Sequence, residues 1–445
     1  MMAISEVEVL PPDEKNKKNM NNSSCCICNN NMGFNIPDDV LVEILCRLPE
    51  KPLIRFKVVS KTWHSLINNF CVPILSKSAP ICGLLFHSTL NNGTVVQTQY
   101  SPLTSPEEAD PNVFVQSYKA LLPSDPASYK LLDCCNGLLL FVRENTQYYV
   151  CNPENTQYYV CNPATKQCVE IPRFVEHPTA SYSCLAFNPF KSPHYKVVCV
   201  DYTQHDTSLS NPPRLDIFSS DTWEWVTREV PIEAPVYGVP WIKCTAYLDG
   251  VLYRLSRSNH LLCFDLNAMS ARAIELPTKY RITKYRSRSR DRTVNYMRNH
   301  MGTIGASRDH LYYAIYDGPN MQIWFLEDHS LKVGSHWILK HTLCTNRSAE
   351  DPLAEFIFLA HLCNYPFIPY AFHPTSEVLF LGIPELIGTY DLESNKLEKV
   401  FEPKLGARLV CPLYNIHPYS RCLVSLKDCL ASRHRPHGSI QSTKT

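Results

Sequence analysis

A unit made of two paired strand patterns recurs from about residue 81 onward, and it constrains the fold more than any other feature. One half is a polar turn before an apolar strand, as in Asn136-Gly137 before LLLFV and Asp249-Gly250 before VLYRL. The other half is a strand ending in an aromatic residue or cysteine, then a polar turn and another strand, as in LLCFDLNAMSARAIELP. Because no long amphipathic helix interrupts the series, this part of the chain is expected to form a β domain.

The spacing of the units predicts a β-propeller. Equivalent positions lie 46 to 65 residues apart, at Cys161, Phe218, Phe264, Phe325 and Tyr390. A loose period of about 50 residues is typical of a four-stranded blade. The segments ICGLLFHST near residue 81 and YNIHPYSRCLVSL near residue 414 are expected to pair as a sixth blade, which removes the free sheet edges. A pair of packed sheets, a β-sandwich, is the structural alternative.

Residues 36–67 form a smaller unit, because their apolar side chains follow the 3.6-residue period of a helix. Pro49 and Pro52 end the first helix and restart the chain, and Ser60 can cap a third helix that carries Trp63. Three helices this short cannot close a hydrophobic core alone. Their remaining apolar surface is therefore expected to pack on the β domain, on a partner or on both.

The charge and cysteine content narrow the class of protein. The chain has 43 Lys and Arg against 42 Asp and Glu, which argues against binding nucleic acid through its overall charge. Its 20 cysteines are fewer than a disulfide scaffold requires. Neither a signal sequence nor a membrane-spanning apolar stretch is visible. The expectation is an intracellular protein, in the cytoplasm, the nucleus or both, with mostly reduced thiols.

Motifs for chemistry are scarce. The sequence has no G-x-S-x-G elbow, no glycine-rich phosphate loop and no paired histidine spacing. Cys25, Cys26 and Cys28 lack a second pair of metal ligands, and Cys134-Cys135 is interpreted as a pair of buried thiols. No catalytic residue, metal or cofactor is therefore predicted. The tryptophans are expected to pack against strands, with a ligand-lining face as the alternative; they are Trp223, Trp225, Trp241, Trp324 and Trp337.

Two segments stand apart from the repeating pattern. The decapeptide ENTQYYVCNP occurs twice, at 144–153 and 154–163. Because ten is even, a slip between the copies keeps each side chain on its face, and one copy is expected to pair within a blade while the other bulges out or extends a hairpin. Residues 281–298 hold six arginines and a lysine. A solvated loop is predicted there, with RNA binding or nuclear import as the alternative.

The stretch IPDDVLVEILCRLPEKPLIRFKVVSKTWHSLI resembles an F-box. The matching features are Ile36-Pro37, Val40-Leu41, Ile44-Leu45, Arg47-Leu48-Pro49, Leu53, Arg55-Phe56, Val59-Ser60-Lys61 and Trp63. Downstream, CNGLLLF, YYVCNPATKQCVEIP and AFNPFKSPHYKVVCV are similar to the F-box-associated domain of plant F-box proteins, a kelch-like β-propeller. Cys168 departs from that family, whose members often carry tryptophan there, and the duplicated decapeptide is not part of its pattern.

The resemblance implies a mainly β protein with a small α domain: an N-terminal three-helix F-box followed by a six-bladed β-propeller. The expected organisation is a disordered leader (1–33), an F-box (34–75), an F-box-associated propeller-like domain (76–430) and a disordered tail (431–445).

The resemblance also implies a function in ubiquitin-dependent protein degradation. The chain would be a non-catalytic substrate-recognition adaptor of a Skp–cullin–F-box ubiquitin ligase, whose propeller holds the target protein. Adaptor contacts and internal helix contacts would be shared among Ile36, Pro37, Leu41, Ile44, Leu45, Leu48, Pro49, Leu53, Val59 and Trp63. One alternative is a protein- or carbohydrate-binding module outside any ligase, and another is an enzyme on a propeller scaffold.

Overall fold

The structure is a computed structural model. It describes residues 36–77, 79–90, 95–103, 114, 118–125, 128–143, 156–174, 183–201, 213–232, 245–256, 259–277, 302–317, 320–327, 336–344, 358, 367–383, 386–401, 408–409 and 416–431. The leader, residues 432–445 of the tail, the first decapeptide copy, Trp241 and the arginine-rich segment 281–298 lie outside the described residues, and so do the predictions made on them.

Six four-stranded sheets make up the β domain in the described part of the chain. Blade 1 contains β1(Ile81–Leu90), β2(Val95–Pro102), β23(Arg408–Leu409) and β24(His417–Ser420). Blade 2 contains β3(Tyr129–Cys135), β4(Leu138–Arg143), β5(Gln157–Asn162) and β6(Gln167–Glu170). Blade 3 contains β7(Ser183–Ala186), β8(Lys196–Asp201), β9(Arg214–Ser219) and β10(Glu224–Glu229).

The remaining blades follow the same order. Blade 4 contains β11(Thr245–Leu248), β12(Val251–Leu255), β13(His260–Asp265) and β14(Ser270–Glu275). Blade 5 contains β15(Gly302–Ser307), β16(His310–Asp317), β17(Asn320–Leu326) and β18(Trp337–Cys344). Blade 6 contains β19(Ile368–Phe372), β20(Val378–Ile383), β21(Leu386–Asp391) and β22(Lys396–Phe401).

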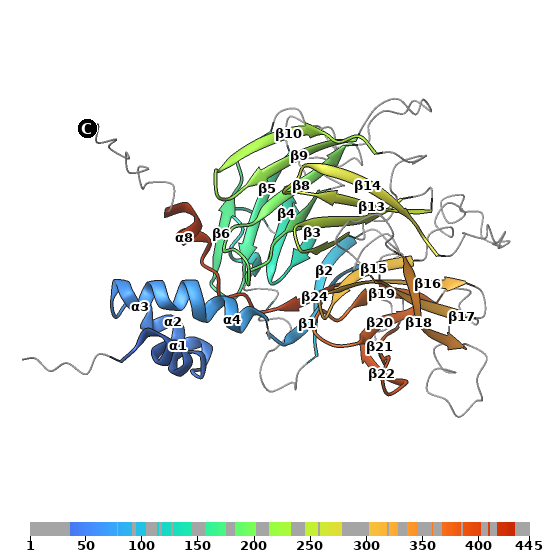
Figure 1. Ribbon diagram of the computed structural model, residues 1–445, viewed down its shortest axis with the longest axis horizontal. Helices are drawn as coiled ribbons and strands as arrows, with labels where there is room; N and C mark the ends of the chain where they lie inside the picture. Colours follow the sequence, from blue (N-terminus) through green and yellow to red (C-terminus); the bar gives the residue numbers. More distant parts are fainter. Residues whose placement is uncertain are drawn as a thin grey trace, which may run out of the picture.

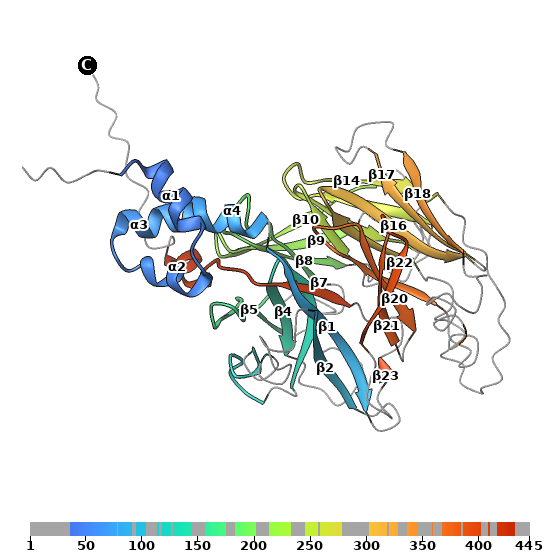
Figure 2. The same cartoon turned by 90° about the horizontal axis from the view of Figure 1, so that it is seen from below.

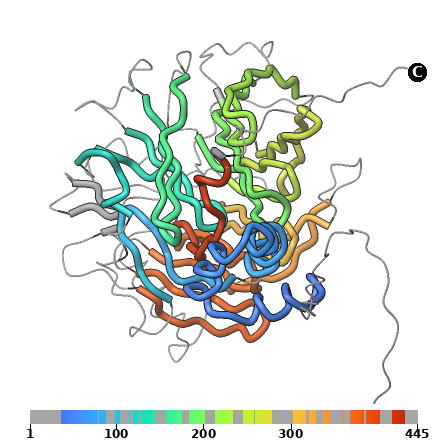
Figure 3. Tube along the Cα trace, turned by 90° about the vertical axis from the view of Figure 1, so that its left-hand side faces the viewer, coloured from blue at the N-terminus to red at the C-terminus, as the bar shows by residue number. Residues whose placement is uncertain are grey.

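The blades close into a ring, as predicted. One strand of each blade lies beside the corresponding strand of the next, in the order β24, β3, β7, β11, β15, β19 and back to β24. β24 pairs antiparallel with β1, with Leu85 opposite His417, so the two ends of the β domain complete blade 1 together. Figure 3 looks onto this ring from the side of the helices, and the sequence colours pass around it. The sixth blade and its closure are confirmed, and the β-sandwich alternative is wrong.

Local turn chemistry explains why the repeat was visible in the sequence. All five equivalent aromatic or cysteine positions lie on the third strand of a blade, from Cys161 on β5 to Tyr390 on β21. The β3–β4 turn holds Asn136 at φ 46° and Gly137 at φ 85°, and the β11–β12 turn holds Asp249 and Gly250 at 51° and 90°. Two successive positive φ angles define the type I′ turn, which matches the twist of a tight hairpin.

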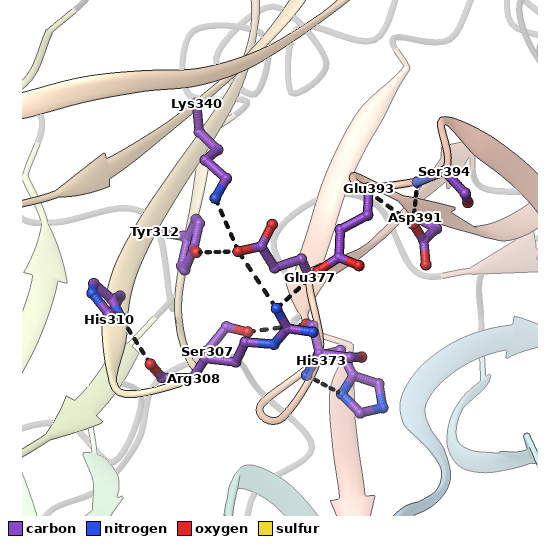
Figure 4. A network of polar contacts seen from close by, with 11 residues as sticks. Ser307, Arg308, His310, Tyr312, Lys340, His373, Glu377, Asp391, Glu393 and Ser394 are labelled. Atoms are coloured by element: carbon purple, nitrogen blue, oxygen red, sulfur yellow. Dashed lines mark hydrogen bonds and ion pairs between the residues drawn. The ribbon is translucent and has the colours of Figure 1, made fainter.

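Side chains between the blades hold neighbouring sheets together. The indole N–H of Trp337 on β18 donates to the Glu275 carbonyl of blade 4 at 3.0 Å. Between blades 5 and 6, Glu377 accepts from the Lys340 ammonium at 3.0 Å and from the Tyr312 hydroxyl at 3.3 Å. Arg308 approaches the same carboxylate at 3.8 Å, so the Glu377 carboxylate is paired with two cationic side chains (Figure 4).

The N-terminal helices form a separate unit beside the ring (Figures 1 and 2). They are α1(Asp38–Cys46), α2(Glu50–Phe56), α3(Lys61–Leu66), the π-helical turn η1(Ile67–Cys71) and α4(Val72–Lys77). As predicted, the Ser60 hydroxyl caps α3 by accepting from the backbone N–H of Trp63 at 3.1 Å. The third helix continues past its expected end, with η1 widening the helix directly before Pro73, which has no N–H to donate.

Candidate functional site

Helix α1 carries two apolar stripes with different surroundings. Ile36, Val40 and Ile44 recur every four residues and remain 51%, 43% and 48% exposed. Side chains four apart share a helix face, so the three belong to one exposed stripe that begins just before the helix. Leu41 and Leu45 are also four apart, and they pack into the hydrophobic core. A small folded unit thus presents a row of large apolar side chains to solvent, which is typical of a protein-binding surface.

The structure divides the ten predicted adaptor-contact residues, which the sequence could not do. Five are exposed, namely Ile36, Pro37, Ile44, Pro49 and Val59. Three are half-buried, namely Leu41, Leu48 and Trp63. Leu45 and Leu53 are buried, with 1% and 0% of their surface exposed. The exposed five are available to a partner, whereas the buried two hold the helices together.

Exposed apolar residues outside that set were missed. Val58, beside Val59 in the turn after α2, is 88% exposed, and Phe70 and Ile74 are 53% and 48% exposed. Phe70 and Ile74 are four residues apart along the continuous helix formed by α3, η1 and α4. Their spacing predicts a shared helical face, but only if the third helix is taken to continue past Ile67.

The helices share one hydrophobic core with the β domain. Leu53 and Ile67 of the helical unit belong to the same buried cluster as Leu138 of blade 2, Phe187 beside β7, and Leu426 near the end of the described chain. The apolar surplus predicted for the helical unit is therefore partly buried against the ring. The exposed stripe on α1 is the part that the ring leaves uncovered.

A C-terminal stretch, residues 421–431, passes between the helices and blade 2, and we call it the return segment. It leaves β24 and ends in α8(Leu426–Ala431), which the sequence analysis did not predict (Figure 1). Asp428 on α8 accepts from the Asn68 side-chain amide at 3.1 Å, and His64 lies 3.6 Å from the same carboxylate. Arg421 approaches Glu50 of α2 at 3.3 Å.

Asn162, the last residue of β5, fixes the return segment to blade 2. Its side-chain amide donates to the carbonyls of Cys422 and Val424 at 3.0 and 2.8 Å, and it is fully buried. Opposite it, at the start of β6, the Gln167 side-chain oxygen accepts from the backbone N–H of Leu426 at 2.7 Å. The two side chains hold both ends of the stretch that leads into α8.

Comparison with the equivalent turns of two other blades explains why position 162 is an asparagine. The side-chain oxygens of Asp265 in blade 4 and Asp391 in blade 6 each accept from two backbone N–H groups of the following turn. The Asn162 oxygen faces the same two positions, at 3.1 and 3.4 Å. Either residue type can order this turn, but only an amide also donates to the two carbonyls of the return segment.

Two family models match the chain in the regions just described. A model of the F-box associated beta propeller domain matches residues 84–401, and a model of the F-box domain matches residues 34–75. The chain belongs to the F-box-associated β-propeller family. Its helical unit is an F-box, and its six-bladed ring is the F-box-associated propeller.

Similar proteins in Arabidopsis thaliana are also F-box proteins. F-box protein At5g07610 is 31% identical over 260 residues, which are 54% of this chain and 56% of that protein. F-box protein At5g03970 is 23% identical over 418 residues, covering 86% and 87% of the two chains. The match thus spans little more than half the length of the first relative. Among solved structures, "Crystal structure of Nidogen/Laminin Complex" gives a TM-score of 0.40 at 11% identity, covering 76% of this chain and 99% of that one.

The cysteines of this F-box-associated propeller depart from the expectation at one place. Eleven described cysteines remain thiols, and burial raises the pKa of the Cys135 thiol to about 12, as expected for a structural thiol. Cys161 and Cys168 instead form a disulfide between β5 and β6. This bond was not predicted from the sequence, because a pair seven residues apart becomes opposed only through the register of the two strands.

A buried carboxyl group lies where blades 1, 2 and 3 of the propeller meet. Asp133 on β3 accepts from the backbone N–H groups of Cys134 and Leu185, both at 2.8 Å, and His417 lies 3.6 Å away. Burial raises the pKa of Asp133 to about 6, against the opposing effect of the two N–H donors. The folded chain therefore binds a proton here more readily than the unfolded chain does.

Stability should fall as pH rises through the window set by Asp133. Between the ordinary pKa of 3.8 and the raised value of about 6, the folded state holds more protons, so deprotonation favours unfolding. From pH 4.5 to 7 the wild type should lose about 2 kcal/mol of unfolding free energy relative to Asp133→Asn. Urea denaturation of both proteins at the two pH values measures this difference, and parallel pH curves would contradict it.

Metal and membrane sites find no support in the described parts of the chain. There, no group of three or more His, Cys, Asp or Glu side chains is arranged to hold a metal ion. None of the helices described has the length and apolar character needed to cross a membrane.

Proposed function

We propose that this chain is the substrate-recognition subunit of a Skp–cullin–F-box ubiquitin ligase. The observation that carries the proposal is the exposed stripe of Ile36, Val40 and Ile44 on a helix whose neighbouring stripe is buried in the core. Apolar side chains that a folded protein leaves exposed in a row mark a protein interface. Membership of the F-box family supports a Skp-type adaptor as the occupant.

In this proposal the F-box comprises residues 34–75 and the propeller domain residues 76–430. The shared core and the return segment fix one to the other, so a target bound to the propeller is held at a set position relative to the adaptor. Such a subunit performs no chemistry. It raises the effective concentration of the target beside the ubiquitin-charged enzyme. The proposed place of action is the cytoplasm, the nucleus or both.

Charging the exposed stripe should abolish adaptor binding without unfolding the chain. Ile44→Asp combined with Val59→Asp places carboxylates on two exposed positions, 48% and 57% accessible, so folding should tolerate them. Burying two unpaired charges in the interface should weaken binding of a Skp-type adaptor more than about 100-fold. Isothermal titration calorimetry with the purified full chain measures the loss.

Leu339→Asp on β18 is the matched control, because Leu339 is a similarly exposed leucine (44%) on the propeller. It should bind the adaptor as the wild type does. If the double variant binds the adaptor as tightly as the wild type, the proposed role of the stripe is wrong. That result would favour a binding module that acts outside a ligase.

A further inference from the structure

The disulfide of blade 2 joins β5 and β6 next to the two residues that bind the return segment. Cys161 on β5 and Cys168 on β6 are directly opposed in the strand register, with their Cα atoms 4.1 Å apart. Cys161 is fully buried, whereas Cys168 is partly exposed. Cys168 is thus the more accessible of the two bonded residues.

The two residues that hold the return segment lie immediately inside this bond. Asn162 follows Cys161 and binds the carbonyls of Cys422 and Val424. Gln167 precedes Cys168 and accepts from the backbone N–H of Leu426, the first residue of α8. The bond therefore fixes the spacing of the two side chains that hold the segment.

The return segment also contacts the F-box through helix α8. Leu426 and Cys429 of α8 are buried in the core that also contains Leu53 and Ile67 of the F-box. On the exposed side of α8, Asp428 accepts from the Asn68 side-chain amide. Helix α8 therefore contacts both the β5–β6 turn and the F-box, so a change in the turn can reach the F-box through this helix.

We propose that the Cys161–Cys168 pair is a reversible redox site whose state sets how firmly the return segment, and with it the F-box, is held on the propeller. The proposal concerns the chain alone and holds whether or not a Skp-type adaptor binds.

The reduction step begins at Cys168, the partly exposed residue. A dithiol reductant attacks the Cys168 sulfur as a thiolate, the sulfur–sulfur bond breaks, and its electron pair leaves on Cys161, which takes up a proton. The second thiol of the reductant then displaces Cys168 from the mixed disulfide and forms the oxidised, disulfide form of the reductant. In the reverse direction, hydrogen peroxide accepts two electrons from the two thiols, and the products are the disulfide and two molecules of water.

Two measurements on the purified full chain test the proposal. Differential alkylation with mass spectrometry, in glutathione buffers from fully reduced to fully oxidised, should show the pair converting between dithiol and disulfide. Hydrogen–deuterium exchange of Leu426–Ala431 should become roughly tenfold faster in the reduced chain, because the turn that holds the segment gains freedom.

The variants separate the redox site from general effects of reductant. Cys168→Ala should make α8 exchange insensitive to reductant, and Cys168→Trp tests the same point if the alanine variant folds poorly. Cys344→Ser, which removes an exposed cysteine of blade 5, should respond as the wild type does. The proposal is overturned if the pair stays in one state across all buffers, if α8 exchange is equal in both states, or if Cys168 pairs with Cys151 of the first decapeptide copy instead of Cys161.

Discussion

Replacing Leu45 with aspartate is expected to unfold the F-box, whereas the same change at the adjacent Ile44 leaves it folded. Leu45 is 1% exposed and packs in the core with Leu53 and Ile67, while Ile44 is 48% exposed. An unpaired charge in an apolar core costs several kcal/mol, and a helical unit this small has little stability to lose. Hydrogen–deuterium exchange across α1 to α3 distinguishes the two variants.

The milder Leu45→Ala variant provides a graded control. Loss of a buried leucine side chain typically costs about 2–5 kcal/mol, so the F-box should be weakened but less than by aspartate. The propeller strands of blades 4 and 5, which do not contact Leu45, should exchange as in the wild type. Equal behaviour of the Leu45 and Ile44 aspartate variants would show that the two stripes of α1 are wrongly assigned.

Asn162→Asp should detach the return segment although the substitution is nearly isosteric. The carboxylate can still accept from the turn, as Asp265 does, but it cannot donate to the carbonyls of Cys422 and Val424. Two buried carbonyls would lose their donor and face a negative charge instead, at a cost of about 3–5 kcal/mol. Chemical denaturation gives the loss, and hydrogen exchange of α8 should show its location.

Asp265→Asn is the reciprocal control, because that turn needs only the side-chain oxygen that asparagine retains. Its effect should stay below about 1 kcal/mol. If both substitutions cost the same, Asn162 would be an ordinary turn residue and the return segment would be held by other contacts.

The propeller was predictable because its signals are local. The Asn136-Gly137 and Asp249-Gly250 turns need positive φ angles that few residues adopt, and Arg308-Asp309 forms a similar turn in blade 5. The helical period of the F-box was equally visible. The different roles of Leu45 and Ile44 were not visible in the sequence. These adjacent apolar residues belong to two stripes of the same helix, and only contacts with distant segments decide which stripe is buried.

The return segment and its attachments escaped prediction for physical reasons. Asn162 and the Cys422 carbonyl that it binds are 260 residues apart in sequence. Helix α8 is six residues long, too short to show a periodic pattern. The helical unit was expected to end at residue 67, yet the widened turn η1 allows the third helix to continue to Lys77.

The central claim is that the F-box offers its exposed α1 stripe to a Skp-type adaptor while the propeller stays free of it. Hydrogen–deuterium exchange of the full chain, with and without saturating adaptor, tests this claim most directly. The account predicts slower exchange in residues 36–48 and around Val59, and no change in β11 to β14 of blade 4. Unchanged exchange in α1, or protection confined to the propeller blades, would contradict it.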